Sequence, residues 1–364
     1  MKATFDAKTL ADAVTWTARH IPARPTTPVL TGILITANEG EATLSAFDYD
    51  VSARATLPAV VAEPGTVLVP GRIFAEVVKS LPAGHPVETG LSGTDLSITC
   101  GGVEFTLPTL PVDDYPTLPD APATVGTMQA EDLRRAVTHV APAASKDPTI
   151  PALTGIRLDA TGQDLHLAAT DRYRIAADTL PWQPAGDIGH LIPAAILSDL
   201  AKTLGHGPVE LGIADDGGLA AITHAGRTTT VRLLDPEYID YEPRLNPEQM
   251  TTWGECDLAP LTTAVRRVAL VADRGTAVRL AFTAGQVQVL AGGGDSGRGT
   301  ETLPADLGGA PIEVAFQPGF LLDGLGGITA DRVRIGMTGP GKAVLFLGAD
   351  NDTFRYLLQA VRLS

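Results

Sequence analysis

Cysteine is almost absent from this sequence. The 364 residues include two cysteines, Cys100 and Cys256, which lie far apart in the chain. A zinc site needs ligands at short, regular spacings, and a disulfide framework needs several cysteine pairs. We therefore expect neither a zinc site nor a disulfide scaffold, and we expect both thiols to lie in the protein core.

Long hydrophobic runs are also missing. Hydrophobic residues make up 44% of the chain, yet no apolar run approaches the roughly 20 residues that cross a bilayer. Residues 1–12 contain no apolar segment followed by a small-residue cleavage site, so no secretory signal is expected there. These features predict a soluble, cytoplasmic protein that does not bind membranes. Its length suggests two or three domains of roughly 100 to 200 residues each.

Positive charge is in short supply. The chain has 27 Lys and Arg residues against 42 Asp and Glu residues, which gives a formal net charge of −15. This balance argues against a surface coated with positive charge, as found in many proteins that bind nucleic acids tightly. A local concentration of basic residues remains compatible with the composition.

Motifs of known enzymes are few, and the ones present have a structural explanation. Residues 292–297 satisfy the G-x-G-x-x-G pattern of dinucleotide sites, but that motif must open a helix, and residues 298–303 read as a strand. Residues 294–297 also look like the nucleophile region of chymotrypsin-like proteases, where Ser296 would need a base and an orienting carboxylate. We interpret the segment as a glycine-rich hairpin turn and keep a serine enzyme as an alternative.

Metal and phosphate motifs are not found. The seven histidines are scattered, and neither H-E-x-x-H nor G-x-x-x-x-G-K-[ST] occurs. Asp113 and Asp114 precede a proline-rich stretch and read as a helix cap or a solvated turn. The sequence therefore predicts a protein with no catalytic residue, no metal and no cofactor.

Two separate segments recur at one spacing. Residues 28–34 (Pro-Val-Leu-Thr-Gly-Ile-Leu) return as residues 151–157 (Pro-Ala-Leu-Thr-Gly-Ile-Arg), and residues 44–50 return as residues 167–173. Both offsets are 123 residues, which chance rarely produces, so the chain contains an internal duplication. A helical Leu-x-x-Ala-Val pattern indicates a third copy, since it occurs at Leu10, Ala13, Val14, at Leu133, Ala136, Val137 and at Leu261, Ala264, Val265.

Each copy shows the same order of predicted elements. In the first copy an amphipathic helix over residues 5–20 follows Asp6, a suitable N-cap, and strands follow at 32–37 and 42–46. A further strand leads into a second helix that ends near residue 81, and its counterparts end near residues 204 and 325. Short strands close each copy, and those of the first copy are predicted at 87–100 and 103–107.

Two proline-rich linkers separate the copies. Residues 114–119 (Asp-Tyr-Pro-Thr-Leu-Pro) resemble residues 240–247 (Asp-Tyr-Glu-Pro-Arg-Leu-Asn-Pro), which pairs Tyr115 with Tyr241. The predicted domains are therefore 1–121, 122–249 and 250–364. Two helices and about eight strands per copy favour an α+β fold, with helices packed on antiparallel sheets. Three such units can associate head to tail.

With three copies established, the chain resembles bacterial replicative sliding clamps, the beta subunits of DNA polymerase III. The resemblance spans the whole chain. It rests on residues 21–25, 28–30, 44–53, 114–116, 153–155, 169–174, 356–358 and 361–363. The run Val-Ala-Asp-Arg-Gly at 271–275 is similar to clamps of high-GC Gram-positive bacteria.

The resemblance implies a head-to-tail homodimer that forms a six-domain ring, with twelve helices lining a hole that holds double-stranded DNA. The ring acts without catalysis, since it encloses DNA and allows sliding through weak, screened contacts. Its implied partners are the replicative DNA polymerase alpha subunit, the clamp loader and other proteins that carry a clamp-binding motif.

The distribution of charge agrees with this expectation. The six predicted helix windows, 7–20, 71–82, 130–144, 194–204, 257–271 and 319–328, contain nine basic and seven acidic residues. The windows therefore carry +2 and the rest of the chain −17. The residues expected to face DNA are Arg19, Arg24, Lys79, Arg134, Arg135, Lys202, Arg266 and Arg267. At the dimer interface we expect Phe105, in the first repeat of one subunit, to meet the region of Leu270, in the third repeat of the other subunit.

The resemblance also implies a pocket for short linear peptides between the second and third copies. Apolar walls with a few polar groups suit leucine and phenylalanine anchors of such peptides. The matching residues are Leu153, Thr170, Arg172, Tyr173, Arg174, Ile175, Arg244, Gln317, Phe320, Leu357, Leu358, Gln359, Val361 and Arg362.

Several departures from the family pattern fall at this pocket. Gln359 and Ala360 stand where the family usually has Met-Pro, Ser364 is an extra residue, and the preceding linker contains Ile239 and Pro243. A polar glutamine replaces an adaptable thioether, and alanine removes a rigid backbone turn. One hypothesis is a specialised second clamp with a retuned pocket, for example one that tolerates a pocket-directed inhibitor. Another alternative is a peptide-binding scaffold that does not enclose DNA.

Overall fold

The chain forms two compact units. The computed structural model describes residues 1–186, 188–235, 237–272, 276–292, 297–350 and 353–362. Unit 1 comprises Met1–Thr127 and Pro208–Arg232, and unit 2 comprises Met128–Gly207 and Leu233–Ser364. Ser296, Ser364 and most of the run 271–275 lie outside the described residues, so the predicted turn and the extra terminal residue have no structural outcome.

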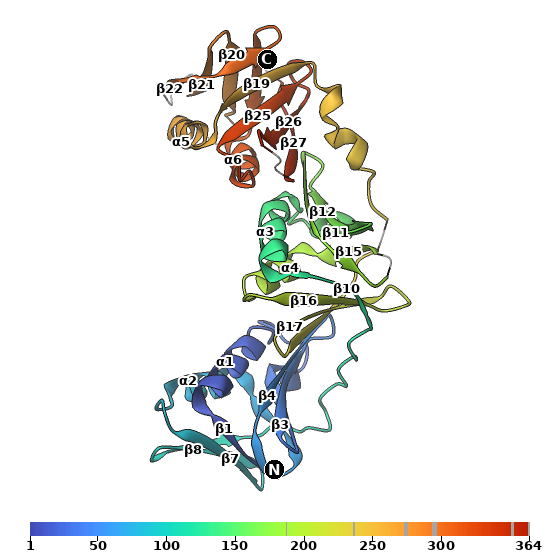
Figure 1. Cartoon of the computed structure of the whole chain (residues 1–364). Coiled ribbons are helices and arrows are strands. Elements are labelled where there is room, and N and C mark those ends of the chain that lie inside the picture. Colours follow the sequence, from blue (N-terminus) through green and yellow to red (C-terminus); the bar gives the residue numbers. More distant parts are fainter. Residues whose placement is uncertain (187, 236, 273–275, 293–296, 351–352, 363–364) are drawn as a thin grey trace. The chain divides into compact units, whose positions relative to one another are not determined.

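Three repeats share one order of elements (Figure 1). In the described part of the chain, each repeat has nine strands and two α-helices, in the order strand, helix, five strands, helix, three strands. This arrangement confirms the predicted α+β fold of three tandem copies, and it adds one strand per copy to the predicted number.

The bounds of the elements follow the repeats. The first repeat contains β1 (Lys2–Asp6), α1 (Ala7–Ala18), β2 (Gly32–Asn38), β3 (Glu41–Phe47), β4 (Val51–Pro58), β5 (Val60–Glu63), β6 (Gly65–Pro70), α2 (Gly71–Ser80), β7 (Pro86–Ser92), β8 (Asp95–Cys100) and β9 (Val103–Pro108). The second contains β10 (Thr124–Gln129), α3 (Ala130–Val140), β11 (Gly155–Thr161), β12 (Asp164–Thr170), β13 (Arg174–Pro181), β14 (Gln183–Pro184), β15 (Gly189–Pro193), α4 (Ala194–Ala201), β16 (Pro208–Ile213), β17 (Leu219–His224) and β18 (Arg227–Arg232). The third contains β19 (Thr252–Asp257), α5 (Leu258–Val268), β20 (Val278–Thr283), β21 (Gln286–Gly292), β22 (Arg298–Pro304), β23 (Asp306–Gly308), β24 (Ile312–Phe316), α6 (Pro318–Gly326), β25 (Arg332–Met337), β26 (Ala343–Gly348) and β27 (Arg355–Gln359).

Most predicted elements are present, and two predictions need correction. Asp6 caps α1 as predicted, because its Oδ1 accepts a hydrogen bond from the Thr9 amide at 2.8 Å. The single strand predicted over 87–100 is wrong, since β7 and β8 form a hairpin that turns at Gly93 with φ 61°. Helix α4 ends at Ala201 rather than near residue 204, because the amides of the next residues make short-range bonds that tighten its last turn.

Unit 1 is built from two sheets and the helix pair α1 and α2. One sheet has the order β5-β1-β7-β8-β9, and the other runs β16-β17-β18-β4-β3-β2-β6 within this unit. Helices α1 and α2 pack side by side (Figure 1). Leu10 and Phe74 enter one apolar core with Leu44, and Cys100 is buried in the same core, as predicted.

Unit 2 follows the same plan with the helix pairs α3 with α4 and α5 with α6. Its large sheet has nine strands in the order β15-β11-β12-β13-β27-β26-β25-β19-β23, and a second sheet has the order β22-β21-β20-β24. Leu133 and Leu261, which the repeated helix pattern identified, are both buried. Cys256 is buried as well, and burial raises the pKa of its thiol to about 12.

The duplication is visible in the backbone of a tight turn. Asp48 accepts hydrogen bonds from two amides ahead of it in unit 1, and Asp171 does the same in unit 2. The residue after each aspartate, Tyr49 or Arg172, has φ 77° although it is not glycine. An aspartate that bonds the backbone ahead of it stabilises such a left-handed residue. These turns lie 123 residues apart, the same offset as the sequence repeat.

The linkers align differently from the predicted pairing. The pKa of Tyr115 is raised to about 12, because the effect of burial exceeds the opposing effect of the Phe47 backbone. The Tyr115 hydroxyl therefore lies near the backbone of Phe47. Burial also raises the pKa of Tyr238, whose hydroxyl lies near the backbone of Thr170. Because Phe47 and Thr170 are 123 residues apart, Tyr238 is the structural counterpart of Tyr115. The pairing of Tyr115 with Tyr241 is therefore wrong by three residues.

Candidate functional site

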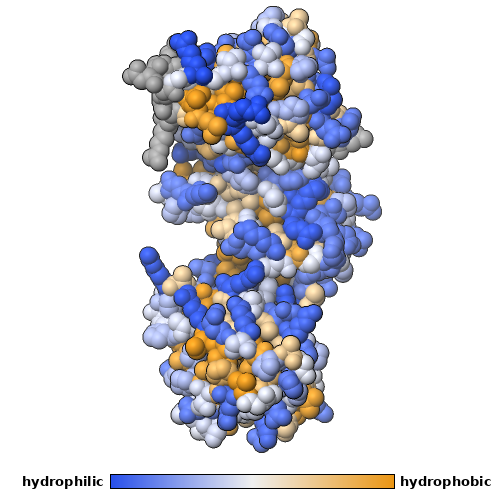
Figure 2. Space-filling view, turned by 90° about the vertical axis from the view of Figure 1, so that its left-hand side faces the viewer, coloured by the Kyte–Doolittle hydropathy of each residue, from blue (hydrophilic) through white to orange (hydrophobic). Residues whose placement is uncertain are grey.

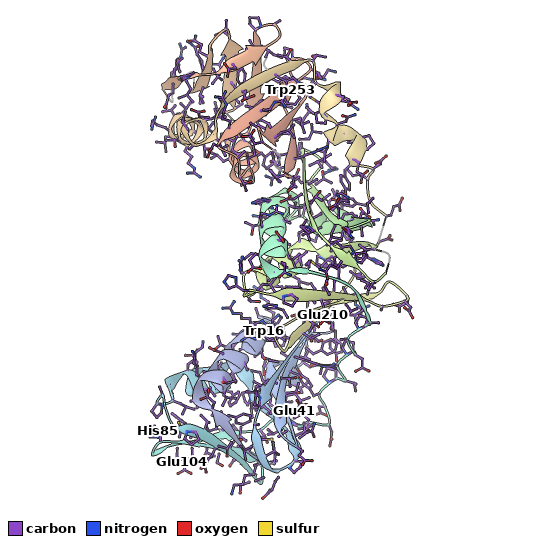
Figure 3. The ribbon with its side chains drawn as sticks, viewed as in Figure 1. Trp16, Glu41, His85, Glu104, Glu210 and Trp253 are labelled. Atoms are coloured by element: carbon purple, nitrogen blue, oxygen red, sulfur yellow. The ribbon has the colours of Figure 1, made fainter. Side chains whose placement is uncertain are left out.

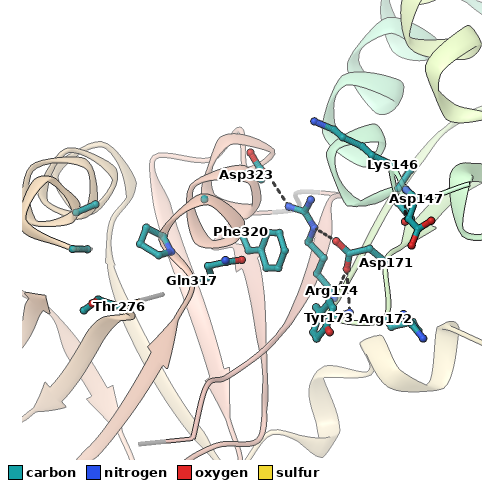
Figure 4. A pocket seen from close by; sticks show the side chains of 16 residues that line it. Lys146, Asp147, Asp171, Arg172, Tyr173, Arg174, Thr276, Gln317, Phe320 and Asp323 are labelled. Carbon is teal, nitrogen blue, oxygen red and sulfur yellow. Dashed lines mark hydrogen bonds and ion pairs between the residues drawn. The ribbon is translucent and has the colours of Figure 1, made fainter. Parts of the chain in front are cut away.

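The candidate site is a pair of adjoining cavities in unit 2, of which Figure 4 shows the first. The first cavity has a volume of about 790 Å³ and the second about 440 Å³. Four residues line both cavities, namely Tyr173, Thr276, Gln317 and Phe320. The first cavity is further lined by Ala144, Ser145, Lys146, Asp147, Asp171, Arg172, Arg174, Ala269, Ala272, Pro318, Gly319 and Asp323, and the second by Ala277, Gln359 and Val361.

The two walls of the first cavity come from different repeats, which one sheet holds together. Strand β13 of the second repeat pairs antiparallel with β27 of the third, and Ile175 lies opposite Leu357. Behind this pairing, Ile175, Tyr241 and Leu245 form a buried apolar cluster with Leu345. The sheet and the cluster together fix the turn after β12 against helix α6.

The turn after β12 presents an aromatic side chain to the cavities. The buried Thr170 hydroxyl donates to the Arg174 carbonyl at 2.6 Å and accepts from the Arg172 amide at 3.2 Å. These bonds hold the turn from below, so that Tyr173 is 60% exposed. The Tyr173 ring lies nearly parallel to the Phe320 ring of α6, with centroids 6.4 Å apart. The cavities therefore have an aromatic floor between two fixed elements.

Arg174 joins the walls through ion pairs. Its Nε lies 2.9 Å from Asp171 Oδ2 in the turn, and its Nη1 lies 2.6 Å from Asp323 Oδ2 on α6. Its Nη2 donates to the Pro142 carbonyl. Both terminal nitrogens and Nε therefore have partners within the protein, and the guanidinium links three segments of unit 2. Figure 4 shows its bonds to Asp171 and Asp323.

Arg174 also organises the aromatic groups. Its guanidinium carbon stands 4.2 Å from the centre of the Phe320 ring, a cation–π contact. Tyr356 donates its hydroxyl to the Phe320 carbonyl at 2.8 Å. Burial lowers the pKa of Arg174, but Tyr356 and the Asp323 carboxylate raise it by more, so the net shift is upward. The guanidinium therefore stays charged and keeps its ion pairs with Asp171 and Asp323.

The end of the chain closes the second cavity. The Gln359 amide donates to the Tyr173 carbonyl at 2.8 Å, which extends the pairing of β27 with the turn. The side-chain Nε2 of Gln359 donates to the Gly341 carbonyl at 2.9 Å and to the Ala360 carbonyl at 3.1 Å. The glutamine is thus tied to the turn between β25 and β26, while Val361 remains 45% exposed.

The structure brings together half of the predicted pocket residues and places the others nearby. Arg172, Tyr173, Arg174, Gln317, Phe320, Gln359 and Val361 line the cavities. Thr170, Ile175, Leu357 and Leu358 belong to or support the paired strands, Leu153 is buried in a preceding turn, and Arg244 and Arg362 are exposed outside the cavity walls.

Several lining residues were not predicted. Asp323 and Asp171 hold Arg174, and Lys146 and Asp147 form part of the rim. Asp323 follows Phe320 by three residues on α6, and this spacing puts both side chains on one helix face. That spacing is a signal by which sequence reasoning could have found it. The position of the 145–147 loop has no such local signal.

The eight predicted DNA-facing residues differ in their surroundings. Arg19, Arg24 and Arg266 are exposed, and Lys79, Lys202 and Arg267 are exposed and near Glu76, Asp199 and Glu301 respectively. Arg134 donates to the Leu204 carbonyl at 2.9 Å. Arg135 Nη1 lies 2.6 Å from the buried carboxylate of Asp178, so its guanidinium is held against the protein. Figure 2 shows hydrophilic side chains projecting over apolar surface on the helix side of each unit.

Comparison with known families identifies the kind of protein. The family models described as DNA polymerase III beta subunit, N-terminal, central and C-terminal domain match residues 1–119, 127–240 and 243–362. The chain belongs to the DNA polymerase III beta subunit family. This beta subunit is 42% identical to the beta sliding clamp of Streptomyces coelicolor over 377 residues, with 100% of each chain covered.

Two further comparisons support the assignment of this beta subunit. It is 40% identical over 373 residues to the beta sliding clamp homolog GriR of Streptomyces muensis, covering 100% of this chain and 99% of the relative. The crystal structure of the Pseudomonas aeruginosa DnaN sliding clamp bound to griselimycin matches with a TM-score of 0.93 at 26% identity, over 100% of both chains. The Streptomyces relatives confirm the resemblance to high-GC Gram-positive clamps.

The remaining predicted positions in this beta subunit lie at element edges. Phe105 is half-buried on β9, and Leu270, in the turn Ala269–Val271 after α5, is 83% exposed. Among the described residues no helix is long and apolar enough to cross a membrane.

Proposed function

We propose that this chain is a DNA sliding clamp. Two copies close head to tail around double-stranded DNA, and the ring tethers the replicative polymerase as a non-catalytic processivity factor in the cytoplasm. Enclosure supplies retention, and weak screened contacts with the phosphates permit sliding. We propose three domains with the boundaries expected from the sequence, 1–121, 122–249 and 250–364.

One observation carries the proposal: the edge strands β9 and β22 have no pairing partner on one side within the described residues, whereas the equivalent strands of the other repeats are paired with each other. In unit 1, β4 pairs with β18, which we call the first joint. In unit 2, β13 pairs with β27, the second joint. The third repeat has β22 at the position of β4 and β13, and the first repeat has β9 at the position of β18 and β27. Both β9 and β22 are sheet edges within the described residues.

Two open edges of this kind can pair with each other in a second copy. Such a head-to-tail contact forms a closed ring when the rotation fits, and it removes exposed edges that invite aggregation. Glu104, labelled in Figure 3, marks β9 at the outer edge of its sheet in unit 1. Pairing β9 of one copy with β22 of the other creates a third joint twice in each dimer.

The closed joints predict the register of the third joint. Ala53 lies opposite Thr229 in the first joint, and Ala176 lies opposite Tyr356 in the second. The hairpins β8–β9 and β17–β18 both turn through two positive-φ residues, which aligns Phe105 with Thr229. The pairings of β20 with β21 and of β21 with β22 align Gly299 with Ala176.

This register places Phe105 of one copy opposite Gly299 of the other. An aromatic residue then lies over a small one, as Tyr356 lies opposite Ala176 in the second joint. The turn that carries Leu270 contacts β22, so this exposed leucine would be covered by the arriving β9 strand. Burial of such side chains is a large favourable term in association.

The basic residues of the helices support contact with DNA. We propose that seven residues face the phosphates. Arg19, Lys79, Arg134, Lys202, Arg266 and Arg267 lie on the helices or directly after them, and Arg24 lies in the loop that follows α1. Arg135 contributes charge at closer range to the protein, because Asp178 and the Thr179 carbonyl hold it. A net charge of −15 for the whole chain keeps these contacts weak enough for sliding.

We propose that the cavities take the linear peptides of the DNA polymerase alpha subunit, the clamp loader and other proteins with a clamp-binding motif. Tyr173 and Phe320 offer aromatic surface, and Gln317 and Gln359 offer polar groups beside it. Apolar surface beside a few polar groups, as in the second cavity, is typical of peptide anchor sites. The predicted residues outside the cavity walls would hold these walls in place.

A second candidate is a specialised clamp with a retuned pocket, and the position of Gln359 favours it. Its side chain is bonded to Gly341, so it lines the second cavity with an amide. A fluorescent Gln-Leu-x-Leu-Phe peptide separates the candidates when it is titrated against the natural protein and against the double variant Gln359→Met, Ala360→Pro. Micromolar binding by the natural protein, about −8 kcal/mol, supports an ordinary clamp. Weak binding that the double variant restores supports retuning.

The enclosing function is tested by retention on DNA. The protein is loaded on a nicked circular plasmid with a clamp loader, and the plasmid is then cut once. Retention on the circle and release from the cut DNA are expected for a ring that slides. A protein that stays on both forms, or binds neither, would instead be a scaffold that does not enclose DNA. A serine enzyme would require hydrolytic activity that Ser296→Ala abolishes.

A further inference from the structure

Two cations at the rim of the first cavity have no ion-pair partner. Lys146, in the loop after α3, and Arg172, in the turn after β12, both line the cavity and are exposed. None of the ion pairs within 4.0 Å in the described residues involves Lys146 or Arg172, although Arg172 lies close enough to Asp147 for its charge to lower the pKa of that carboxyl. In Figure 4 the Lys146 side chain extends from its loop toward the side of α6. We call Lys146 and Arg172 the rim cations.

Three of the other charged groups of this cavity, Arg174, Asp171 and Asp323, are paired with one another. Arg174 is bonded to Asp171 and Asp323, so neither its charge nor their charges are available to a ligand. Asp147 accepts a hydrogen bond from the Thr149 amide at 3.0 Å, and bonds to Thr149 together with the charge of Arg172 lower its pKa. Asp147 therefore stays negative beside the rim cations, which are the groups of this cavity with free donors.

The opposite wall carries one charged residue, Asp323 on α6, which is paired with Arg174. Its other members are Ala269, Ala272, Pro318, Gly319 and Phe320, with Gln317 and Thr276 as polar groups. The cavity is thus asymmetric, with an apolar wall from the third repeat and free cationic donors from the second. A ligand that fills it well has an apolar anchor on one side and a carboxylate on the other.

We propose that the natural peptides of this pocket carry acidic residues beside their apolar anchors, and that these carboxylates bind Lys146 and Arg172. The inference rests on the proposed peptide-binding function and names the class of peptide. Since the chain as a whole is strongly acidic, with a net charge of −15, an acidic peptide is repelled elsewhere and attracted at this rim. The rim cations would therefore act on selectivity more than on total affinity.

The test compares peptides that differ in charge alone. Fluorescent Gln-Leu-Ser-Leu-Phe peptides are prepared with three Glu or three Gln residues before the anchors, and in a second pair after them. Each is titrated against the full-length protein in 50 mM and 500 mM salt. In one of the two placements, before or after the anchors, we expect the Glu peptide to bind three- to tenfold more tightly than its Gln counterpart at low salt. The difference should be small at high salt, because salt screens exposed ion pairs.

Charge-reversal variants assign the preference to residues. Lys146→Glu and Arg172→Glu should each reduce the preference for the Glu peptide, measured as the ratio of its affinity to that of the Gln peptide. Lys2→Glu in unit 1 is the matched control, since Lys2 is exposed and lies in the other unit. It changes the net charge equally and should leave the preference intact.

Three results would overturn the inference. Equal affinities of the Glu and Gln peptides at low salt contradict it while leaving the pocket proposal in place. A preference that survives both charge reversals also contradicts it, as does a loss of DNA retention in Lys146→Glu with an unchanged peptide preference, which would assign the lysine to phosphate contact. If none of the peptides binds, the proposed pocket function itself fails.

Discussion

The first and second joints have the same backbone and different chemistry. In both, a strand that follows a tight aspartate turn pairs antiparallel with the last strand of the next repeat. In the first joint, Trp16 of α1 faces the Arg227 guanidinium 5.5 Å away. In the second joint, His139, at the position of Trp16, has its ring edge against Phe354, with centroids 5.4 Å apart. The aromatic and basic positions have thus been exchanged between equivalent elements.

The second joint alone contains a buried carboxylate at this level. Asp178 is 1% exposed and is bonded to Arg135, His139 and Thr353, whereas its counterpart in the first joint is Ala55. A buried charge with several donors is costly to disrupt, because removing one partner strands the others. The strand pairing therefore sets the fold, while the side chains decide which joint carries an ionic network and a ligand cavity.

The largest expected effect comes from removing that carboxylate. Asp178→Ala leaves the Arg135 guanidinium without its counter-charge and should lower the free energy of unfolding of unit 2 by about 3 kcal/mol. Denaturant unfolding in a Trp16→Phe background reports on unit 2, because Trp182 and Trp253 lie there. The matched change Ala55→Gly should lower the free energy of unfolding of unit 1 by about 1 kcal/mol. The fluorescence of Trp16 reports this unfolding in a protein that lacks the other two tryptophans. A loss below 1 kcal/mol in Asp178→Ala would show that the network does not stabilise the joint.

The next effect extends the comparison to the third joint. Phe105→Ala removes the aromatic residue that we place opposite Gly299 of the partner copy, and it should weaken dimerisation about 30-fold, or about 2 kcal/mol. Sedimentation velocity at nanomolar to micromolar concentration measures this change. Glu88→Ala, an exposed change on β7 of the same sheet, is the control and should leave the dimer unchanged. An unaltered dimer in Phe105→Ala would place the interface elsewhere.

A substitution of Arg174 tests what the second joint contributes to peptide binding. Arg174→Ala leaves Asp171 and Asp323 unpaired and frees Phe320, so peptide affinity should fall at least tenfold, about 1.4 kcal/mol. The equivalent residue of the first joint is Val51, and Val51→Ala should not alter peptide affinity. Similar losses in both variants would mean that the effect is a general loss of stability.

The smallest effect is a pH dependence of the second joint. Burial raises the pKa of Asp178, but hydrogen bonds from His139 and Thr353 and the charge of Arg135 lower it by a larger amount. The pKa of Asp178 is therefore below the ordinary value of 3.8. The unfolded chain then binds the proton more tightly, so this stabilisation is present above about pH 4 and is lost as pH falls below it. Asp178→Asn should make the stability curve of unit 2 flatter between pH 5 and 3, by at most about 1.4 kcal/mol per pH unit. Parallel curves for the two proteins would contradict this account.

Local signals in the sequence predicted the repeats well. Asp6 as a cap and the 123-residue offset involve residues close in sequence or in strict periodicity, so they could be read directly. The site was predicted only in part, and by resemblance. Asp323 pairs with Arg174 across 149 residues of chain, and no local pattern records such a pairing, whereas Asp171 lies only three residues before Arg174. The misaligned linker has the same origin, since the burial of Tyr238 against Thr170, rather than the local letter sequence, defines its counterpart.

The choice of side chains in each joint could not be predicted either. Position 139 reads as an ordinary helical histidine until Asp178 is brought beside it at 2.9 Å. Equivalent positions in the first joint hold Trp16 and Ala55, so even the repeat gives no guide. Pairing of distant strands supplies this information, and it is a property of the tertiary structure.

The most direct test of the clamp is a covalent third joint. The predicted register places Thr300 of one copy opposite Glu104 of the other, as Ala177 lies opposite Arg355 in the second joint. The double variant Glu104→Cys, Thr300→Cys is oxidised on a nicked circular plasmid, with Glu104→Cys, Glu301→Cys as a control one residue out of register. The natural cysteines are buried and should not interfere.

The account predicts a dimer with two cross-links that remains on circular DNA in denaturant and is released when the plasmid is cut. Absence of cross-linking, equal cross-linking in the control, or a ladder of open chains in place of a closed dimer would contradict it.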